Sequence, residues 1–244
     1  MVQTGVSEVW GDAWDVYKLL FRRSVLTAAI VFAVIEGLDP LDGAIDQRGA
    51  HIAFAVLSFV LGLAGPVLVQ GALVEIVRNI HEDRRPDSIR ELLAGAGRRI
   101  HSLFWASLVY GFGVFFGLLL LIVPGLLAAS RWCLMAPLIM LEDETAGDAP
   151  LASSHLVRPY TWPVLGTVVV TFIVTSIVNT AIPLGIGFRD VGPFANWLIV
   201  VIASSLTAPF SAHVLTVIYY RITDPENRVI HPDVRTWRSV WEAA

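Results

Sequence analysis

The chain has 244 residues, of which 55% are hydrophobic and 16% are charged, and its mean hydropathy is +0.67. Soluble domains carry about 25% charged residues, so the composition excludes an ordinary soluble domain and a disordered chain. The single cysteine, Cys133, excludes an internal disulfide, and the formal net charge of -4 is informative only when it is divided among the loops.

The first segment, residues 6–21, has apolar side chains at helical spacing and acidic residues on the opposite face. Trp10 and Trp14 belong to this segment, and tryptophan is enriched at the level of the lipid headgroups. The pattern therefore predicts an amphipathic helix at the membrane interface on the cytoplasmic side. An apolar run over residues 22–38 follows directly and predicts the first transmembrane helix.

Five further apolar runs approach or exceed the length that a membrane span needs, about 20 residues. They cover residues 50–77, 103–123, 124–141, 163–187 and 194–220. The third and fourth runs are adjacent and too long together for one span, so the step Val123–Pro124–Gly125 predicts a tight reversal. The sequence thus predicts a single all-α domain over residues 1–244, a polytopic membrane helical bundle with six transmembrane helices and a cytoplasmic tail at 221–244.

Basic residues predict the orientation, because loops rich in Lys and Arg stay on the cytoplasmic side. With both termini in the cytoplasm, fourteen of the 17 Lys and Arg residues lie on that side. Arg48 and Arg189 then lie outside, and Arg131 lies within a span. We expect a multi-pass protein of the cytoplasmic (inner) membrane with both termini cytoplasmic.

Two more cytoplasmic segments begin with helix-start signals, one at Ser88 and one at Asp148. Like residues 6–21, each precedes an odd-numbered span and ends in basic residues. This arrangement suggests a threefold repeat of helical hairpins, the kind of internal symmetry that transporters show. The alternative is that any six-span protein with both ends inside carries basic residues at these places.

A set of residues in the second half of the chain carries a family resemblance. The set consists of Pro124, Gly125, Arg131, Pro137, Glu142, Ser154, Arg158, Trp162, Tyr219, Tyr220 and Arg221. It resembles the multispan membrane domain found attached to some bacterial glycerophosphoryl diester phosphodiesterases, which also occurs alone in YciC-like proteins. The resemblance implies a six-helix bacterial membrane domain, and 244 residues leave no room for the catalytic barrel as well.

Four polar residues within spans form a candidate intramembrane site. Arg131 is predicted to contact Glu36 at a similar depth or, failing that, to donate to carbonyls freed by a proline. The pair would be either a binding site for an anionic solute or headgroup, or a structural pin between helices. Gln70 and His213 each lie four residues after a proline, so they would either line a polar cavity or bond neighbouring helices.

Two other residue groups suggest partners. Arg84, Arg85, Arg98 and Arg99 form a basic patch beside the membrane, which favours anionic lipid over nucleic acid. Gly113 and Gly117 form a GxxxG element that lets another helix approach closely. That helix belongs either to the same chain or to a second copy in a homo-oligomer.

The sequence has no pattern typical of catalysis, such as HExxH, GxSxG or a phosphate-binding glycine loop. We therefore expect no catalytic residues, no metal and no cofactor. The leading hypothesis is a non-enzymatic membrane protein that acts through anionic lipid or as the partner of another membrane protein. The alternative is a transporter or channel for ions or small solutes, with a polar cavity around Arg131.

Overall fold

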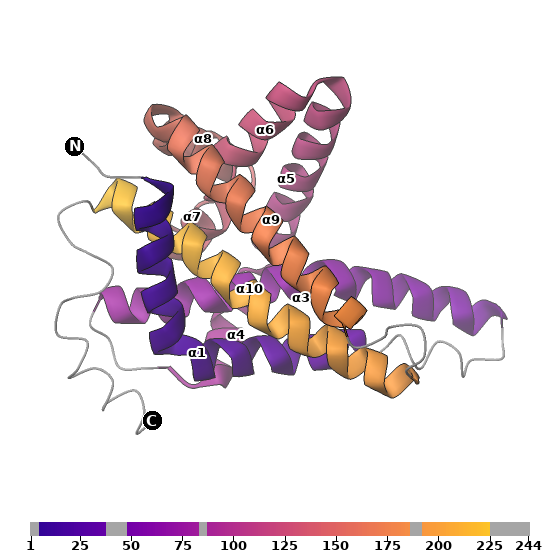
Figure 1. Cartoon of the computed structure of the whole chain (residues 1–244). Helices are drawn as coiled ribbons and strands as arrows, with labels where there is room; N and C mark the ends of the chain where they lie inside the picture. Colours follow the sequence, from indigo (N-terminus) through magenta and orange to yellow (C-terminus); the bar gives the residue numbers. More distant parts are fainter. Residues whose placement is uncertain (1–4, 38–47, 83–86, 186–191, 225–244) are drawn as a thin grey trace.

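The computed structural model describes residues 5–37, 48–82, 87–185 and 192–224, and every regular element in these ranges is a helix. In chain order they are α1 (Val6–Glu36), α3 (Arg48–His81), α4 (Ile89–Arg98), α5 (Ile100–Leu120), α6 (Ile122–Arg131), α7 (Met135–Leu141), α8 (Ala149–Val157), the 3-10 turn η1 (Arg158–Tyr160), α9 (Thr161–Gly185) and α10 (Pro193–Thr223). Figure 1 shows how they gather into one bundle. The predicted all-α fold is confirmed.

Five stretches of the described chain are long and apolar enough to cross a membrane. They are Phe54–His81, Ile100–Leu120, Ile122–Leu141, Ala149–Ile182 and Phe194–Thr223. They correspond to the second to sixth predicted spans, so the chain is a polytopic membrane bundle. The predicted first span, 22–38, is not among them; its last residue lies outside the described ranges, and this span stays a prediction.

The helix α1 joins the predicted interfacial segment and the start of the predicted first span in one helix of 31 residues. Figure 1 shows its first and second halves running in different directions. The apolar stripe of the first half, including Val9, Ala13 and Val16, is buried, and the main packing partner of α1 is α10. This stripe therefore contacts protein and not lipid, because the ring of Phe210 on α10 packs against Trp10 and other rings of α1.

The start of α4 agrees with the predicted cap signal. The Ser88 hydroxyl accepts a hydrogen bond from the Glu91 backbone N–H at 3.3 Å, and the Glu91 carboxylate accepts one from the Ser88 N–H at 2.7 Å. This reciprocal capping box satisfies two N–H groups that the first helical turn leaves without partners. The hydrogen bond from the Ser88 N–H, and a second one that the Ser88 hydroxyl donates to the same carboxylate at 2.8 Å, lower the pKa of Glu91 below its usual value, because they stabilise the ionised carboxylate.

The hairpin of α5 and α6 turns two residues before the predicted reversal. Leu121 has extended backbone angles, φ -163° and ψ 146°, and separates the two helices. Pro124 instead lies in the first turn of α6, where a missing N–H leaves no hydrogen bond unmade. The two helices touch where a Cβ on Gly117 would lie 2.7 Å from the Cα of Gly125, so neither position has room for a side chain.

The three predicted interfacial segments are helical, as the first half of α1, as α4 and as α8. They join their spans in three ways. The first half of α1 continues without a break, α4 stops at Arg99 before α5, and α8 runs through η1 into α9. The threefold repeat stays a prediction. The three units share the order of their elements, but the connection between the interfacial helix and its span differs in each.

Candidate functional site

Most of the charged contacts gather where several helix ends meet, which we call the polar end of the bundle. It consists of the C-terminal ends of α3 and α10, the first turns of α1, the start of α4 and the loop after α7. Arg221 on α10 donates to the Asp12 carboxylate from Nε at 3.0 Å and from Nη2 at 2.6 Å. It also donates to the Glu8 carbonyl at 3.2 Å, so the beginning of α1 is fixed beside the end of α10.

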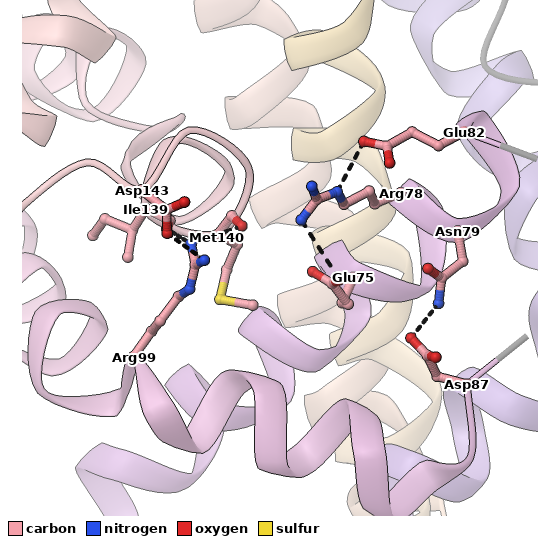
Figure 2. Close-up of polar contacts among 9 residues, drawn as sticks. All are labelled: Glu75, Arg78, Asn79, Glu82, Asp87, Arg99, Ile139, Met140 and Asp143. Carbon is pink, nitrogen blue, oxygen red and sulfur yellow. Dashed lines mark hydrogen bonds and ion pairs between the residues drawn. The ribbon is translucent and has the colours of Figure 1, made fainter. Parts of the chain in front are cut away.

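The end of α3 carries three further contacts, shown in Figure 2. Arg78 donates to Glu82 at 2.9 Å and lies 3.6 Å from a Glu75 oxygen on the same helix. Asn79 is buried and donates to the Asp87 carboxylate at 2.8 Å, which attaches the start of α4 to α3. Arg23 of α1 donates to the Asp87 carbonyl at 3.0 Å, so three helices meet at this residue.

The contacts of Arg99 differ from those expected of a residue in the predicted lipid-facing patch. Its Nη1 donates to the carbonyls of Ile139 at 2.6 Å and Met140 at 2.9 Å, and its Nη2 pairs with Asp143 (Figure 2). The last carbonyls of a helix have no partner within the helix and attract cations, so Arg99 caps the C-terminus of α7. The Arg99 guanidinium therefore binds groups of the protein itself.

The other members of the predicted patch differ from Arg99. Arg98 is exposed, and no ion pair involves it within the described ranges. Arg84 and Arg85 lie outside the described residues. Of the predicted patch, Arg98 is therefore the one arginine in the described chain whose side chain is exposed and makes no ion pair there.

The predicted pair of Arg131 and Glu36 is not formed. Arg131 is exposed at the last position of α6, and among the described residues its side chain makes neither an ion pair nor a hydrogen bond to a carbonyl. The prediction assumed one continuous fourth span, but α6 ends here and packs on α5, α8 and α9, whereas α1 packs mainly on α10 and α3. The two residues therefore belong to different parts of the bundle.

A residue that the sequence did not single out holds the break between α6 and α7. The buried Ser153 hydroxyl donates to the Arg131 carbonyl at 2.6 Å and accepts from the Leu134 N–H at 3.2 Å. Both backbone groups lie at the interruption, where the helix cannot satisfy them. The only sequence signal for Ser153 is its place beside Ser154 in the segment of the family resemblance.

Gln70 and His213 are also not brought together. His213 is fully buried, and its Nε2 lies 3.0 Å from the Ser24 hydroxyl, which joins α10 to α1 as an interhelical hydrogen bond. Gln70 lines a cavity of about 220 Å³ between α3, α5, α9 and α10. Neither Arg131, Glu36 nor His213 lines that cavity.

Three exposed tryptophans, each with an exposed cation nearby in the sequence, make a second set of candidate residues. Trp14 is 52% exposed and lies one helical turn from Lys18, which pairs with Asp15 at 2.7 Å. Trp162 is 73% exposed and lies one turn from Arg158. Trp105, 50% exposed, follows the exposed Arg98 by seven residues, across the break at Arg99 between α4 and α5. We call these residues the tryptophan–cation pairs; indole rings and basic side chains are the residue types that anchor helices at headgroups.

The glycines of the predicted GxxxG element face their own chain. A Cβ on Gly113 would collide with the Trp132 ring, and Gly117 faces Gly125. Packing within the chain therefore accounts for both positions, while a homo-oligomer stays a prediction. One contact joins two residues of the family resemblance: the Tyr219 hydroxyl donates to Glu142 at 2.7 Å.

Comparisons of the chain with protein-family models, with curated proteins and with solved structures give no match. The YciC-like resemblance therefore stays a prediction. Within the described ranges no group of three or more His, Cys, Asp or Glu residues could hold a metal ion.

Proposed function

We propose that the protein is a non-enzymatic integral protein of the bacterial cytoplasmic membrane that binds anionic lipid headgroups through its tryptophan–cation pairs. The observation that carries the proposal is the exposure of a tryptophan and a cation together on α1, at the α4–α5 junction and at the α8–α9 junction. A basic side chain near an anionic membrane surface contributes about 1 kcal/mol to binding. Several such positions would together select anionic lipid over zwitterionic lipid.

The proposed orientation, with both termini cytoplasmic, has support from the polar end. The pairing of Arg221 with Asp12 brings the start of α1 and the end of α10 to the same side of the bundle. With the termini on one side, the topology predicted from the sequence also puts Lys18, Arg98 and Arg158 on that side, which fits the rule that basic segments remain in the cytoplasm.

The test compares lipid retention by purified full-length variants. The main variant combines Lys18→Gln, Arg98→Gln and Arg158→Gln, and native mass spectrometry counts the phosphatidylglycerol molecules that stay bound after extraction from mixed vesicles with phosphatidylcholine. We expect at least a tenfold weaker preference for phosphatidylglycerol, since each cation contributes about fivefold. An unchanged preference in this variant would refute the proposal.

A matched pair of single variants sharpens the result. Arg158→Gln removes a cation one turn from an exposed tryptophan, whereas Arg90→Gln removes an exposed cation of α4 that is not a member of the pairs. We expect the first to weaken phosphatidylglycerol retention by about fivefold and the second by less. Equal effects would mean that general basic charge, and not the tryptophan–cation pairs, binds the lipid.

The alternative of a solute path around Arg131 has less support. Arg131 does not line the cavity, and the described residues that do line it carry no charge. Action as the partner of another membrane protein stays a prediction.

A further inference from the structure

The cavity beside Gln70 lies among four helices and the break in the fourth span. Residues of α3, α5, α9 and α10 line it, together with Trp132, Cys133 and the first turn of α7. Its volume is about 220 Å³, and its described lining is mostly aliphatic and aromatic. An engineered apolar cavity of about 150 Å³ binds benzene, so this space can hold a chain of on the order of ten carbon atoms.

The hydroxyl groups that line the cavity already donate their protons to the backbone. Ser211 donates to the Thr207 carbonyl at 3.2 Å, and Thr175 donates to the Thr171 carbonyl at 2.8 Å. The Tyr110 and Ser107 hydroxyls donate to carbonyls in the same way. A ligand in the cavity would therefore find no hydroxyl proton available on these walls.

Gln70 is different. Within the described parts of the chain its side-chain amide makes no hydrogen bond, although it lines the cavity. A primary amide offers two donors and one acceptor, and a polar group without a partner in an apolar environment costs free energy. A polar group on a ligand would give this amide a hydrogen-bond partner.

The geometry points to a binding site for a neutral amphiphile with a single chain, whose apolar chain fills the cavity and whose one uncharged polar group bonds to the Gln70 amide. The ligand is neutral because no charged residue lines the described wall, and an ion without a partner would be too costly there. The bundle is surrounded by lipid, which supplies molecules of this class. The inference goes beyond headgroup binding at the tryptophan–cation pairs and does not depend on it.

The first test uses bromodecanol with purified full-length protein in detergent. Bromine quenches nearby indole fluorescence, and Trp132 lines the cavity, so the relevant signal is the part of the quenching that Trp132→Phe removes. We expect saturable quenching by bromodecanol and at least tenfold weaker quenching by the charged analogue bromodecyl trimethylammonium. Equal quenching by both probes, or none by the alcohol, would overturn the inference.

The second test uses a substitution that fills the cavity. Ala106 lines the cavity and Ala55 is exposed on α3 outside it, so Ala106→Leu and Ala55→Leu add the same atoms in different places. We expect Ala106→Leu to weaken bromodecanol binding at least tenfold and Ala55→Leu to leave it unchanged. Binding by Ala106→Leu at the wild-type level would contradict the site.

A third variant keeps the test decisive if Ala106→Leu does not fold. In the wild type, bromodecanol should bind about fivefold more tightly than bromodecane, which lacks the hydroxyl, and Gln70→Leu should remove this difference. A difference that persists in Gln70→Leu would show that another group binds the hydroxyl. Phosphatidylglycerol retention should stay at the wild-type level in these variants, which separates this site from the headgroup surface.

Discussion

The polar end and the α5–α6 hairpin hold their helices together in different ways. At the polar end, helices that are distant in sequence are joined by charged side chains, such as Arg221 with Asp12 and Arg99 with the end of α7. In the hairpin, the backbones of α5 and α6 approach at Gly117 and Gly125 without a polar contact between those residues. The hairpin also lacks charged residues between His101 and Arg131.

The difference reflects the two solvents. Apolar side chains gain little by leaving lipid for a helix interface, so close van der Waals packing of small residues holds membrane helices together. Near water, charged groups are solvated at low cost, and their hydrogen bonds can fix which helix ends are neighbours. The hairpin should therefore be the part most sensitive to added volume, and the polar end the part most sensitive to lost hydrogen bonds.

The largest effect is expected from Gly117→Val. Its new Cβ would meet the backbone of Gly125 at 2.7 Å, and backbone atoms cannot move aside as a flexible side chain can. We expect a loss of about 3 kcal/mol in the free energy of unfolding, measured by denaturant titration in mixed micelles. Gly111→Val is the control, because nothing lies within 4 Å of a Cβ at that position; similar losses in both variants would contradict the described packing.

A smaller loss is expected from Arg99→Gln at the polar end. The substitution removes the charge that caps α7 and leaves the carbonyls of Ile139 and Met140 poorly satisfied. We expect about 2 kcal/mol of destabilisation, because hydrogen bonds to charged groups are the stronger ones. The neighbouring variant Arg98→Gln should change stability by less than about 0.5 kcal/mol, and a reversed order of the two arginines would show that the cap is misassigned.

The smallest effect distinguishes two adjacent serines. Ser153→Ala leaves the Arg131 carbonyl and the Leu134 N–H without their shared partner, which should cost about 1 to 2 kcal/mol. Ser154 donates only to the Pro150 carbonyl of its own helix, so Ser154→Ala should have little effect. Thermal unfolding of both proteins in the same detergent measures the difference, and equal midpoints would argue against the bridge.

The sequence predicts the parts of the fold that depend on the solvent and on neighbouring residues. Hydropathy located the second to sixth spans because a bilayer requires long apolar helices, and the Ser88 signal located the start of α4 because capping involves residues three positions apart. The turn at Leu121 was missed by two residues, since Pro124 fits the first turn of a helix as well as it fits a reversal.

The candidate site was harder to predict, because its contacts join distant parts of the chain. Arg99 looks like any other basic loop residue until α7 is known to end beside it. The expectation for Arg131 was wrong because no proline or glycine marks the interruption at Trp132–Leu134, which is held by Ser153 from α8. Side-chain chemistry indicated which residues need partners, but only the packing of helices determines which partners they have.

The absence of charge from the turn of the α5–α6 hairpin has a consequence for biosynthesis. Topology signals act through basic residues near the ends of a span, and the turn at Leu121 offers none to the insertion machinery. The turn therefore carries no basic residue that could direct α5 or α6 to one side of the membrane. We expect the two helices to enter the bilayer as one hairpin, with their direction decided by the arginines that precede α5 and by Arg131 at the end of α6.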